Sequence, residues 1–492
     1  MRFACIAALA IALVADPSIA GQVDQPVSQA SGDVVVSIAA IENLPARGPR
    51  IRPADDHPRV DVEPSPNSVA VAIIDSGVQP HADLPLSRIR AFKDFVGGSS
   101  VPIDTCGHGT HVAGIIAGDG RSSLGAYAGI APGVAIVALR VLGDDCSGNT
   151  SDVIDALDWI GRHHQAYRIK VVNVSLGHAV LESIHTDPLV QAVERLSRKG
   201  IAVVTASGNK GINPATGRPA YGGAGVPCNA PSAICVGSLD TLGTFHLDDD
   251  RVPQSSARGP TRFDLLAKPD LVAPSVNIVS LAAPGSLIFK QFPGMRVSGW
   301  DGQASYFVSS GTSMAAPSVA AAAALLLQAN DRLSANTLKL ALQFTARVLS
   351  ETDALAQGAG ALNIAGALKL VDAIDPGADR GHNWIRYRIT AANVDVFGQS
   401  IRWGQRIIYG DRFMPARYAQ VHLFRWDDDV VWAYDALADG IEWGTADADN
   451  IVWDNEGDGL DTIVWDSGAH RGAWAEDVIE GFWWGDRRSR GQ

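Results

Sequence analysis

Residues 69–78 read Val-Ala-Val-Ala-Ile-Ile-Asp-Ser-Gly-Val, an apolar run that stops at Asp75. A run without polar alternation predicts a strand that is buried on both faces. Similar runs recur at 134–142, 170–174, 201–205 and 234–236, and helical patterns lie between them at 151–163, where Ser151 is the expected N-cap, and at 188–199. This alternation predicts an α/β fold of three layers, a parallel sheet with helices on both faces. Functional groups are then expected in the loops at the carboxyl ends of the strands.

The composition bounds the class of protein. The 492 residues are 46% hydrophobic, which is enough apolar material for a sizeable core and rules out a mostly disordered chain. The net charge of −13 disfavours a general nucleic-acid binder, so we expect no nucleic-acid partner. Beyond the first twenty residues no stretch is apolar over the length of a bilayer, so an integral membrane protein is not expected.

The N-terminus has the pattern of an export signal. Arg2 precedes the apolar run 3–15, and small residues at 18 and 20 predict cleavage after Ala20. A buried core helix is the alternative. Residues 21–64 lack periodicity and contain Pro-rich pieces, so they are interpreted as a short leader or linker. The predicted location is secreted, periplasmic or at the cell envelope.

Four cysteines follow the signal. In an oxidising compartment an even set predicts disulfides, and three pairings are open on sequence grounds. Cys228 and Cys235 are close enough to close a short loop, which would leave Cys106 to pair with Cys146. Four free buried thiols are the alternative.

The C-terminal part, residues 376–492, differs in composition from the rest. Ten of the 12 Trp lie after residue 380, and Trp432, Trp443, Trp453 and Trp465 recur with acidic Gly turns between them. Residues 421–492 hold 17 acidic and 5 basic residues, or −12 of the total charge. This pattern predicts a small β-repeat module. Its acidic turns around 447–450 and 454–461 could bind calcium, although solvated turns are favoured.

Three segments carry candidate chemistry. The first is Asp75 at the end of its strand, followed by Ser76-Gly77, where a carboxylate can be desolvated yet hydrogen-bonded. The second is Gly107-His108-Gly109-Thr110-His111, which leads into an apolar helix. The His108–His111 pair also invites a metal interpretation, but no Glu or third ligand lies nearby. The third, residues 309–317, reads Ser-Ser-Gly-Thr-Ser-Met-Ala-Ala-Pro and places Ser313 at the start of a buried helix.

Together, and in the chain order Asp, His, Ser, these segments resemble the subtilisin-like serine proteases, the subtilases. The resemblance covers residues 65–375 and includes supporting stretches at 172–177, 205–209, 268–274 and 358–363. It implies a subtilisin-like catalytic domain that hydrolyses peptide bonds in proteins or peptides. Many secreted relatives carry a folded pro-domain that assists folding, and the segment 21–64 is shorter than such a domain.

The same resemblance assigns roles. Ser313 is the expected nucleophile, His108 the general base and acid, and Asp75 the residue that orients the imidazole. Asn209 is the expected oxyanion-hole donor. No cofactor is required for this chemistry. The acid-acting relatives of this fold, which carry Glu and Asp at the positions of His108 and Asn209, are disfavoured.

The resemblance also implies a substrate-binding cleft and a possible calcium site. Ser175-Leu176-Gly177 and Ser147-Gly148 match the two edges between which the family binds an extended peptide. A Cys106–Cys146 disulfide would join the loop before His108 to one of those edges. Asp83 matches a calcium carboxylate of relatives, and the loop 119–125 could add carbonyl ligands, although surface loops without metal are an equal alternative.

Two other functions stay open at this stage. A catalytically dead scaffold of the same fold is disfavoured by the intact set of Asp75, His108, Asn209 and Ser313. The other is an adhesive role of the Trp-rich module, through contact with the cell envelope or a cationic partner.

Overall fold

The computed structural model describes residues 68–213, 216–244, 246–350, 352–374, 392–396, 399–409, 412–414 and 450–452. The predicted signal peptide (1–20), the leader (21–64) and most of the C-terminal module, including its candidate calcium turns, lie outside these residues. The predictions made for them remain predictions.

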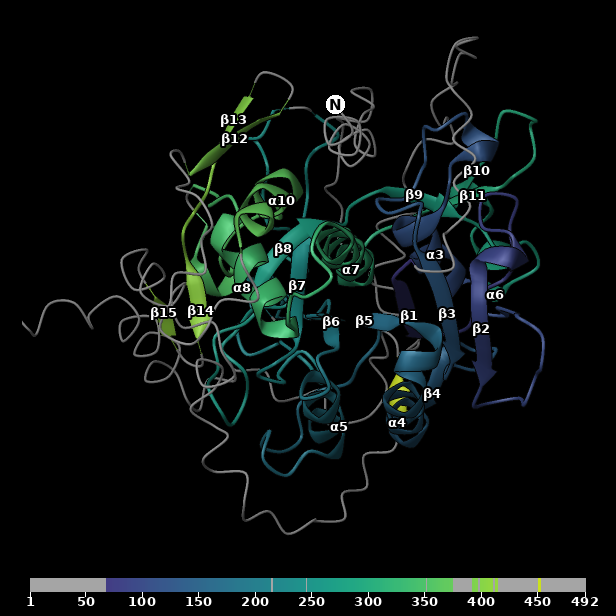
Figure 1. The fold of residues 1–492 in the computed structure, drawn as a ribbon, viewed down its shortest axis with the longest axis horizontal. Coiled ribbons are helices and arrows are strands. Elements are labelled where there is room, and N and C mark those ends of the chain that lie inside the picture. The colour runs from purple at the N-terminus through teal and green to yellow at the C-terminus, as the bar shows by residue number, and fades with distance from the viewer. Residues whose placement is uncertain are drawn as a thin grey trace, which may run out of the picture.

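A seven-stranded parallel sheet forms the centre of the fold, in the order β2-β3-β1-β5-β6-β7-β8 (Figure 1). This confirms the predicted α/β class. The strands are β1 (Ala70–Asp75), β2 (Ile89–Asp94), β3 (Ala135–Arg140), β5 (Ile169–Val174), β6 (Ala202–Ala206), β7 (Ile234–Leu239) and β8 (Leu271–Pro274).

Helices cover both faces of the sheet, which explains the continuous apolar runs. On β1, Val71 and Ile73 belong to the core cluster that includes α3 and α7, whereas Ala70, Ala72 and Ile74 belong to the cluster that includes α4 and α5. Alternate residues of one strand are therefore buried in different layers. The helices are α3 (His108–Ala117), α4 (Thr150–Tyr167), α5 (Pro188–Ser197), α7 (Thr312–Ala329), α8 (Ala335–Thr345), α9 (Ala354–Gln357) and α10 (Ile364–Ala373).

Two helix starts show how well the caps could be predicted. The expected cap at Ser151 is wrong, because α4 begins at Thr150 with Asn149 at the N-cap and without a side-chain cap bond. α5 begins at the predicted Pro188, and the side chain of Asp187 accepts from the N–H groups of the next turn. Among the described residues one helix, α7, is long and apolar enough to span a membrane, and it is buried in the middle of the domain.

The remaining elements are short. An antiparallel sheet joins β10, β11 and β9, and the hairpins β12–β13 and β14–β15 follow α10; β16 pairs antiparallel with β4. Their bounds are β4 (Ser147–Asn149), β9 (Ile278–Leu281), α6 (Leu287–Gln291), β10 (Arg296–Val297), β11 (Tyr306–Ser309), β12 (Asn393–Val396), β13 (Gln399–Arg402), β14 (Ile407–Tyr409), β15 (Arg412–Met414) and β16 (Asn450–Val452), with 3-10 turns at Leu86–Arg88, Arg121–Ser123 and Pro293–Met295.

The chain beyond residue 376 contributes to the core of the α/β domain. Trp403 is only 6% exposed and meets Phe344 of α8 edge to face, at 6.1 Å between ring centroids. The main-chain N–H of Gly404 donates to the Ala346 carbonyl at 2.7 Å, and that of Ile408 donates to the Gln343 side chain at 2.6 Å. A chain that ended at 376 would lose these contacts.

Candidate active site

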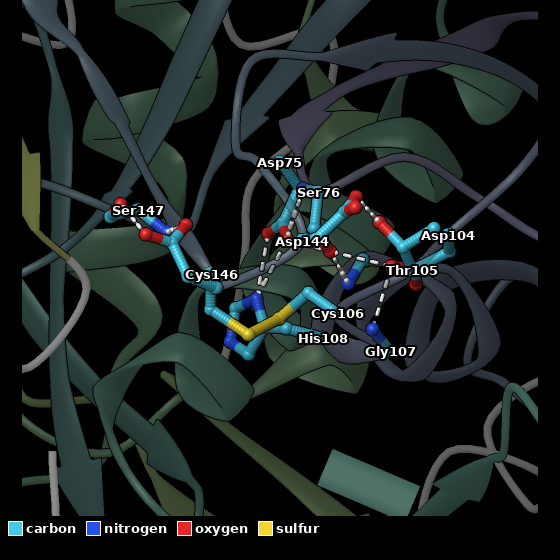
Figure 2. Close-up of a disulfide and its surroundings, with 12 residues drawn as sticks. Asp75, Ser76, Asp104, Thr105, Cys106, Gly107, His108, Asp144, Cys146 and Ser147 are labelled. Atoms are coloured by element: carbon cyan, nitrogen blue, oxygen red, sulfur yellow. Dashed lines mark hydrogen bonds and ion pairs between the residues drawn. A yellow bond between two sulfur atoms is a disulfide. The ribbon is translucent and has the colours of Figure 1, made fainter. Parts of the chain in front are cut away.

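Asp75, the last residue of β1, faces the imidazole of His108 (Figure 2). Its Oδ1 and Oδ2 lie 2.7 and 2.9 Å from His108 Nδ1, and the main-chain N–H of Ser76 donates to Oδ1 at 2.7 Å. Asp75 is fully buried and His108 is 1% exposed. A carboxylate against Nδ1 selects the tautomer with its proton on Nδ1, so Nε2 is the basic nitrogen of this ring.

Glycines allow His108 to stand at the first position of α3. Gly107 has a φ of 103°, in the left-handed region that favours glycine. A Cβ on Gly109 would lie 2.0 Å from the carbonyl oxygen of Gly77. The start of α3 can therefore approach the turn after β1 only with glycine at 109, and this approach brings His108 to Asp75.

Ser313 lies in the first turn of α7, next to the end of β5. Its Oγ donates to the Ser175 carbonyl at 3.0 Å, and Ser175 Oγ donates to the Ser313 carbonyl at 3.0 Å. Ser175 directly follows β5, which is the sheet neighbour of β1. α3 also packs against α7. Asp75, His108 and Ser313 are thus carried to the carboxyl ends of two adjacent strands, where a parallel sheet places its sites.

Asn209 follows β6, and Thr312 fixes the plane of its side-chain amide. The Asn209 Oδ1 accepts from the main-chain N–H of Thr312 at 2.9 Å and from its hydroxyl at 3.1 Å. With Oδ1 engaged at the start of α7, the amide Nδ2 is the group suited to donate to a substrate oxygen. Sequence reasoning missed Thr312, although its position directly before Ser313 was a usable signal.

A second polar network, also missed, lies beneath the Asp75–His108 pair. Ser76 Oγ donates to Asp104 Oδ1 at 2.8 Å, and Asp104 also accepts from the N–H groups of Gly107 and Thr110, both at 2.7 Å. Asp104 is 3% exposed. The signal in the sequence was an Asp four residues before His108, inside a loop that must be held in place.

The two segments predicted to bind substrate lie in β4 and directly after β5. β4 contains Ser147 and Gly148, and a Cβ on Gly148 would lie 2.2 Å from the Val141 carbonyl. Ser175 and Leu176 are buried after β5, and a Cβ on Gly177 would lie 2.2 Å from the Val226 carbonyl. Gly148 and Gly177 therefore occupy positions where a side chain would clash with a neighbouring carbonyl oxygen. In the structure β16 pairs with β4 and occupies that edge.

The cysteines are joined in the predicted pairs. Cys106 bonds to Cys146, and Cys228 bonds to Cys235. Figure 2 shows the first disulfide beside the His108 ring, between the loop that precedes α3 and the residue that precedes β4. Thr105 Oγ1 donates to Asp144 Oδ1 at 2.6 Å, so a second link joins the same two loops. The loop before His108 and the predicted substrate-binding segment at β4 are therefore held together.

His111 is placed for structure and not for metal binding. Its Nε2 lies 3.0 Å from the Phe307 carbonyl and 3.2 Å from the Ile278 carbonyl, so Nε2 carries the proton and donates. Burial, with the nearby His108, lowers the pKa of His111 to about 4. Among the described residues no group of three His, Cys, Asp or Glu could hold a metal ion. The His108–His111 metal interpretation is not supported.

The oxygens around Asp83 do not fit a calcium ion, which the sequence left as one of two equal alternatives. Asp83 is fully buried, its Oδ1 accepts from the Ser122 N–H at 2.8 Å, and its Oδ2 accepts from the Tyr306 hydroxyl. The Gly120 carbonyl in the candidate loop already accepts from the Ser123 and Gly125 N–H groups and from the Ser123 hydroxyl. Calcium requires six to eight oxygen ligands, and these oxygens are engaged with donors of the chain.

Comparisons with known proteins agree with this geometry. The sequence profile of the Subtilase family, peptidase S8, matches residues 67–367. The serine protease AprX of Bacillus subtilis strain 168 is 39% identical over 300 residues, which cover 60% of this chain and 65% of AprX. Subtilisin Savinase of Lederbergia lenta is 33% identical over 292 residues, which cover 59% of this chain and 88% of that protein.

The crystal structure of a cold-adapted subtilisin-like serine proteinase is 30% identical, covers 60% of this chain and 86% of its own, and superposes with a TM-score of 0.43. The matched residues span somewhat less than two thirds of the length of AprX.

Proposed function

This chain belongs to the Subtilase family, and on that premise we propose that it is an exported serine endopeptidase that hydrolyses peptide bonds in proteins or peptides. The observation that carries the proposal is the buried Asp75–His108 pair at the carboxyl end of β1, with Ser313 beside the end of the adjacent strand. The reaction needs no cofactor, because the chain itself supplies a nucleophile, a base and oxyanion donors.

The first half of the reaction forms an acyl-enzyme. Ser313 Oγ attacks the carbonyl carbon of the scissile peptide while its proton passes to His108 Nε2. Asp75 holds the Nδ1 proton and stabilises the positive charge of the ring. The oxyanion accepts from the Asn209 Nδ2 and from the Ser313 N–H. When the carbon–nitrogen bond breaks, His108 donates its proton to the leaving amine.

The second half returns the enzyme to its starting state. His108 Nε2 takes a proton from water, and the resulting hydroxide attacks the acyl carbon. The bond to Ser313 Oγ breaks, and the serine recovers its proton from His108. The contact between the Ser313 hydroxyl and the Ser175 carbonyl holds the nucleophile at the carboxyl end of β5.

Substrate binding is proposed to occur by strand addition. An extended peptide would lie between Ser175-Leu176-Gly177 and Ser147-Gly148 and hydrogen-bond to both main chains, which gives affinity that does not depend on substrate side chains. Since β16 pairs with β4 in the structure, a substrate strand at this edge would take the place of β16. Two strands cannot share one set of hydrogen-bonding groups.

Export and the role of the C-terminal module are also proposals. Both disulfides suit the oxidising compartment that the N-terminal pattern predicts. Contact of residues 376–492 with the cell envelope is the proposed additional interaction. The boundary near 375 stays a prediction, and the packing of Trp403 indicates that a truncated chain should end after residue 409.

Labelling with a serine-directed phosphonate tests this function. We expect the reagent to modify Ser313, as mapped by mass spectrometry, and to abolish casein hydrolysis. Ser313→Ala should fold, as judged by circular dichroism, and should neither take up the label nor cleave casein. Label on another serine, or cleavage by the purified variant at the wild-type rate, would refute the assignment.

A further inference from the structure

The hydroxyl of Ser76 lies between two buried carboxylates and is closer to one of them. Ser76 Oγ is 2.8 Å from Asp104 Oδ1 and 3.3 Å from Asp75 Oδ1. The same oxygen accepts from the N–H of Gly109 at 2.9 Å. The shorter distance assigns the hydroxyl proton to Asp104.

Asp104 is arranged as an ionised acceptor. Its Oδ1 receives the Ser76 hydroxyl and the Gly107 N–H, and its Oδ2 receives both the N–H and the hydroxyl of Thr110, at 2.7 and 2.6 Å. Four donors on two oxygens leave no acceptor for a carboxyl proton. Burial raises the pKa of Asp104, and the hydrogen bonds from Thr110, Gly107 and Ser76 oppose that shift.

The direction of the Ser76 proton matters because Asp75 acts through its own charge. Asp75 must attract the proton of His108 when the imidazole becomes positive. A hydroxyl that donated to Asp75 Oδ1 would satisfy part of that charge and weaken the attraction. The structure directs the Ser76 proton to the other carboxylate, so Asp75 keeps its charge for His108.

We propose that Asp104 is a positioning residue that acts through Ser76: it draws the Ser76 hydroxyl away from Asp75 and fixes the start of α3 against β1. The inference rests on the proposed peptidase function. It adds a residue to the reaction that contacts neither the substrate nor the reacting atoms.

The other charged groups around this pair do not replace Asp104. On α3, His111 is neutral and donates to two main-chain carbonyls. On β3, Arg140 forms ion pairs with Asp94 at 3.0 Å and with Asp144 at 2.8 Å. Among the described residues, Asp104 is therefore the second carboxylate that Ser76 contacts.

The test measures kcat/KM as a function of pH for Asp104→Leu, Ser76→Ala and the double variant. The quantity compared is the half-maximal pH of the acidic limb, the part of the profile where kcat/KM rises with pH. In Asp104→Leu the hydroxyl can turn to Asp75, so the half-maximal pH should fall by about one unit, with lower kcat. Ser76→Ala should leave the limb in place, because the lost proton did not serve Asp75. The double variant should return the limb to the wild-type position.

The double variant separates the hydroxyl from simple electrostatics. Loss of the Asp104 charge alone would also lower the half-maximal pH, but Ser76→Ala would not reverse that effect. A shift that persists in the double variant, or no shift in Asp104→Leu, would overturn the proposal. Asp104→Asn keeps one acceptor oxygen and should give a smaller shift than Asp104→Leu.

Two further measurements guard against misfolding and loss of function. Thr110→Val removes one donor from the far oxygen of Asp104 and should not move the limb. If Asp104→Leu does not fold, Ser76→Ala alone still tests which carboxylate accepts the Ser76 proton. An acidic limb that moves to higher pH in this variant would show that the hydroxyl donated to Asp75, which would overturn the proposal. If wild-type protein hydrolyses no substrate, the proposed function fails, whereas the outcomes above concern Asp104.

Discussion

Asp75 and Asp83 are both fully buried carboxylates near the end of β1, yet they face partners of opposite kinds. Asp75 faces the imidazole of His108, the proposed general base and acid of the reaction. Asp83 faces the Ser122 N–H and the hydroxyl of Tyr306, whose pKa burial and the Asp83 charge raise well above its usual range. A buried carboxylate becomes part of a reaction when its partner can change its protonation state, and otherwise it is part of the scaffold.

The largest expected effects come from neutralising each carboxylate in turn, which tests whether Asp75 acts in the reaction and Asp83 in stability. Asp75→Asn should lower kcat by about 10⁴-fold with little change in melting temperature, because the imidazole loses its tautomer and its counter-charge. Asp83→Asn should do the reverse and lower the melting temperature while the folded enzyme keeps its kcat. Peptide hydrolysis and thermal unfolding of both variants measure this, and equal effects on kcat would show that the contrast is false.

A second test removes the partner of Asp83. Tyr306→Phe takes away one donor and leaves a buried carboxylate oxygen without it, which should cost about 1.5–3 kcal/mol of unfolding free energy. Urea denaturation in a Ser313→Ala background avoids self-cleavage. Tyr127→Phe is a matched control, since it removes a hydroxyl from the ring that packs edge to face on Tyr306. An unchanged unfolding midpoint for Tyr306→Phe would contradict the structure.

The two histidines of α3 differ in the same way: His108 belongs to the proposed reaction, whereas His111 bonds to main-chain carbonyls of the scaffold. For His111 this arrangement predicts a pH effect on stability. His111 has a folded pKa of about 4, below the unfolded value of 6.5, so the unfolded chain takes up a proton first as the pH falls. Stability from neutral His111 is complete above pH 6.5 and is lost between 6.5 and 4. Between pH 7 and 5 this loss is about 2 kcal/mol.

His111→Gln keeps a donor for the two carbonyls and has no titrating ring. In a Ser313→Ala background its urea midpoint should fall less between pH 7 and 5 than that of the parent. Parallel curves for the two proteins would show that His111 is not held neutral.

The smallest expected effect is that of a chelator. Because the oxygens around Asp83 already accept from donors of the chain, EDTA should leave the melting temperature of the Ser313→Ala protein unchanged. Differential scanning calorimetry with EDTA and with added calcium measures this. A drop of several degrees that calcium reverses would show that a metal ion contributes to the fold.

The roles of the site residues were predicted from the resemblance to the subtilases, which no single segment carries alone. An apolar strand that stops at Asp75, a His between two glycines and a Ser two residues after a glycine are local patterns that became specific only in combination. The partner of Asp83 was not accessible, because Tyr306 is 223 residues away and only the folded sheet brings it close. The cap of α4 was missed for another reason: Asn149 and Ser151 both have cap-forming side chains, so the local sequence does not decide between them.

The link between Asp83, Ser122 and Tyr306 also bears on how long such an enzyme survives. A peptidase in solution is surrounded by active copies of itself, and self-digestion begins where a loop opens locally. A bound ion protects such a loop only while its concentration is maintained, because its contribution follows mass action. Here the contacts are made by atoms of the chain, so the protection that we expect for this loop does not depend on the concentration of an ion.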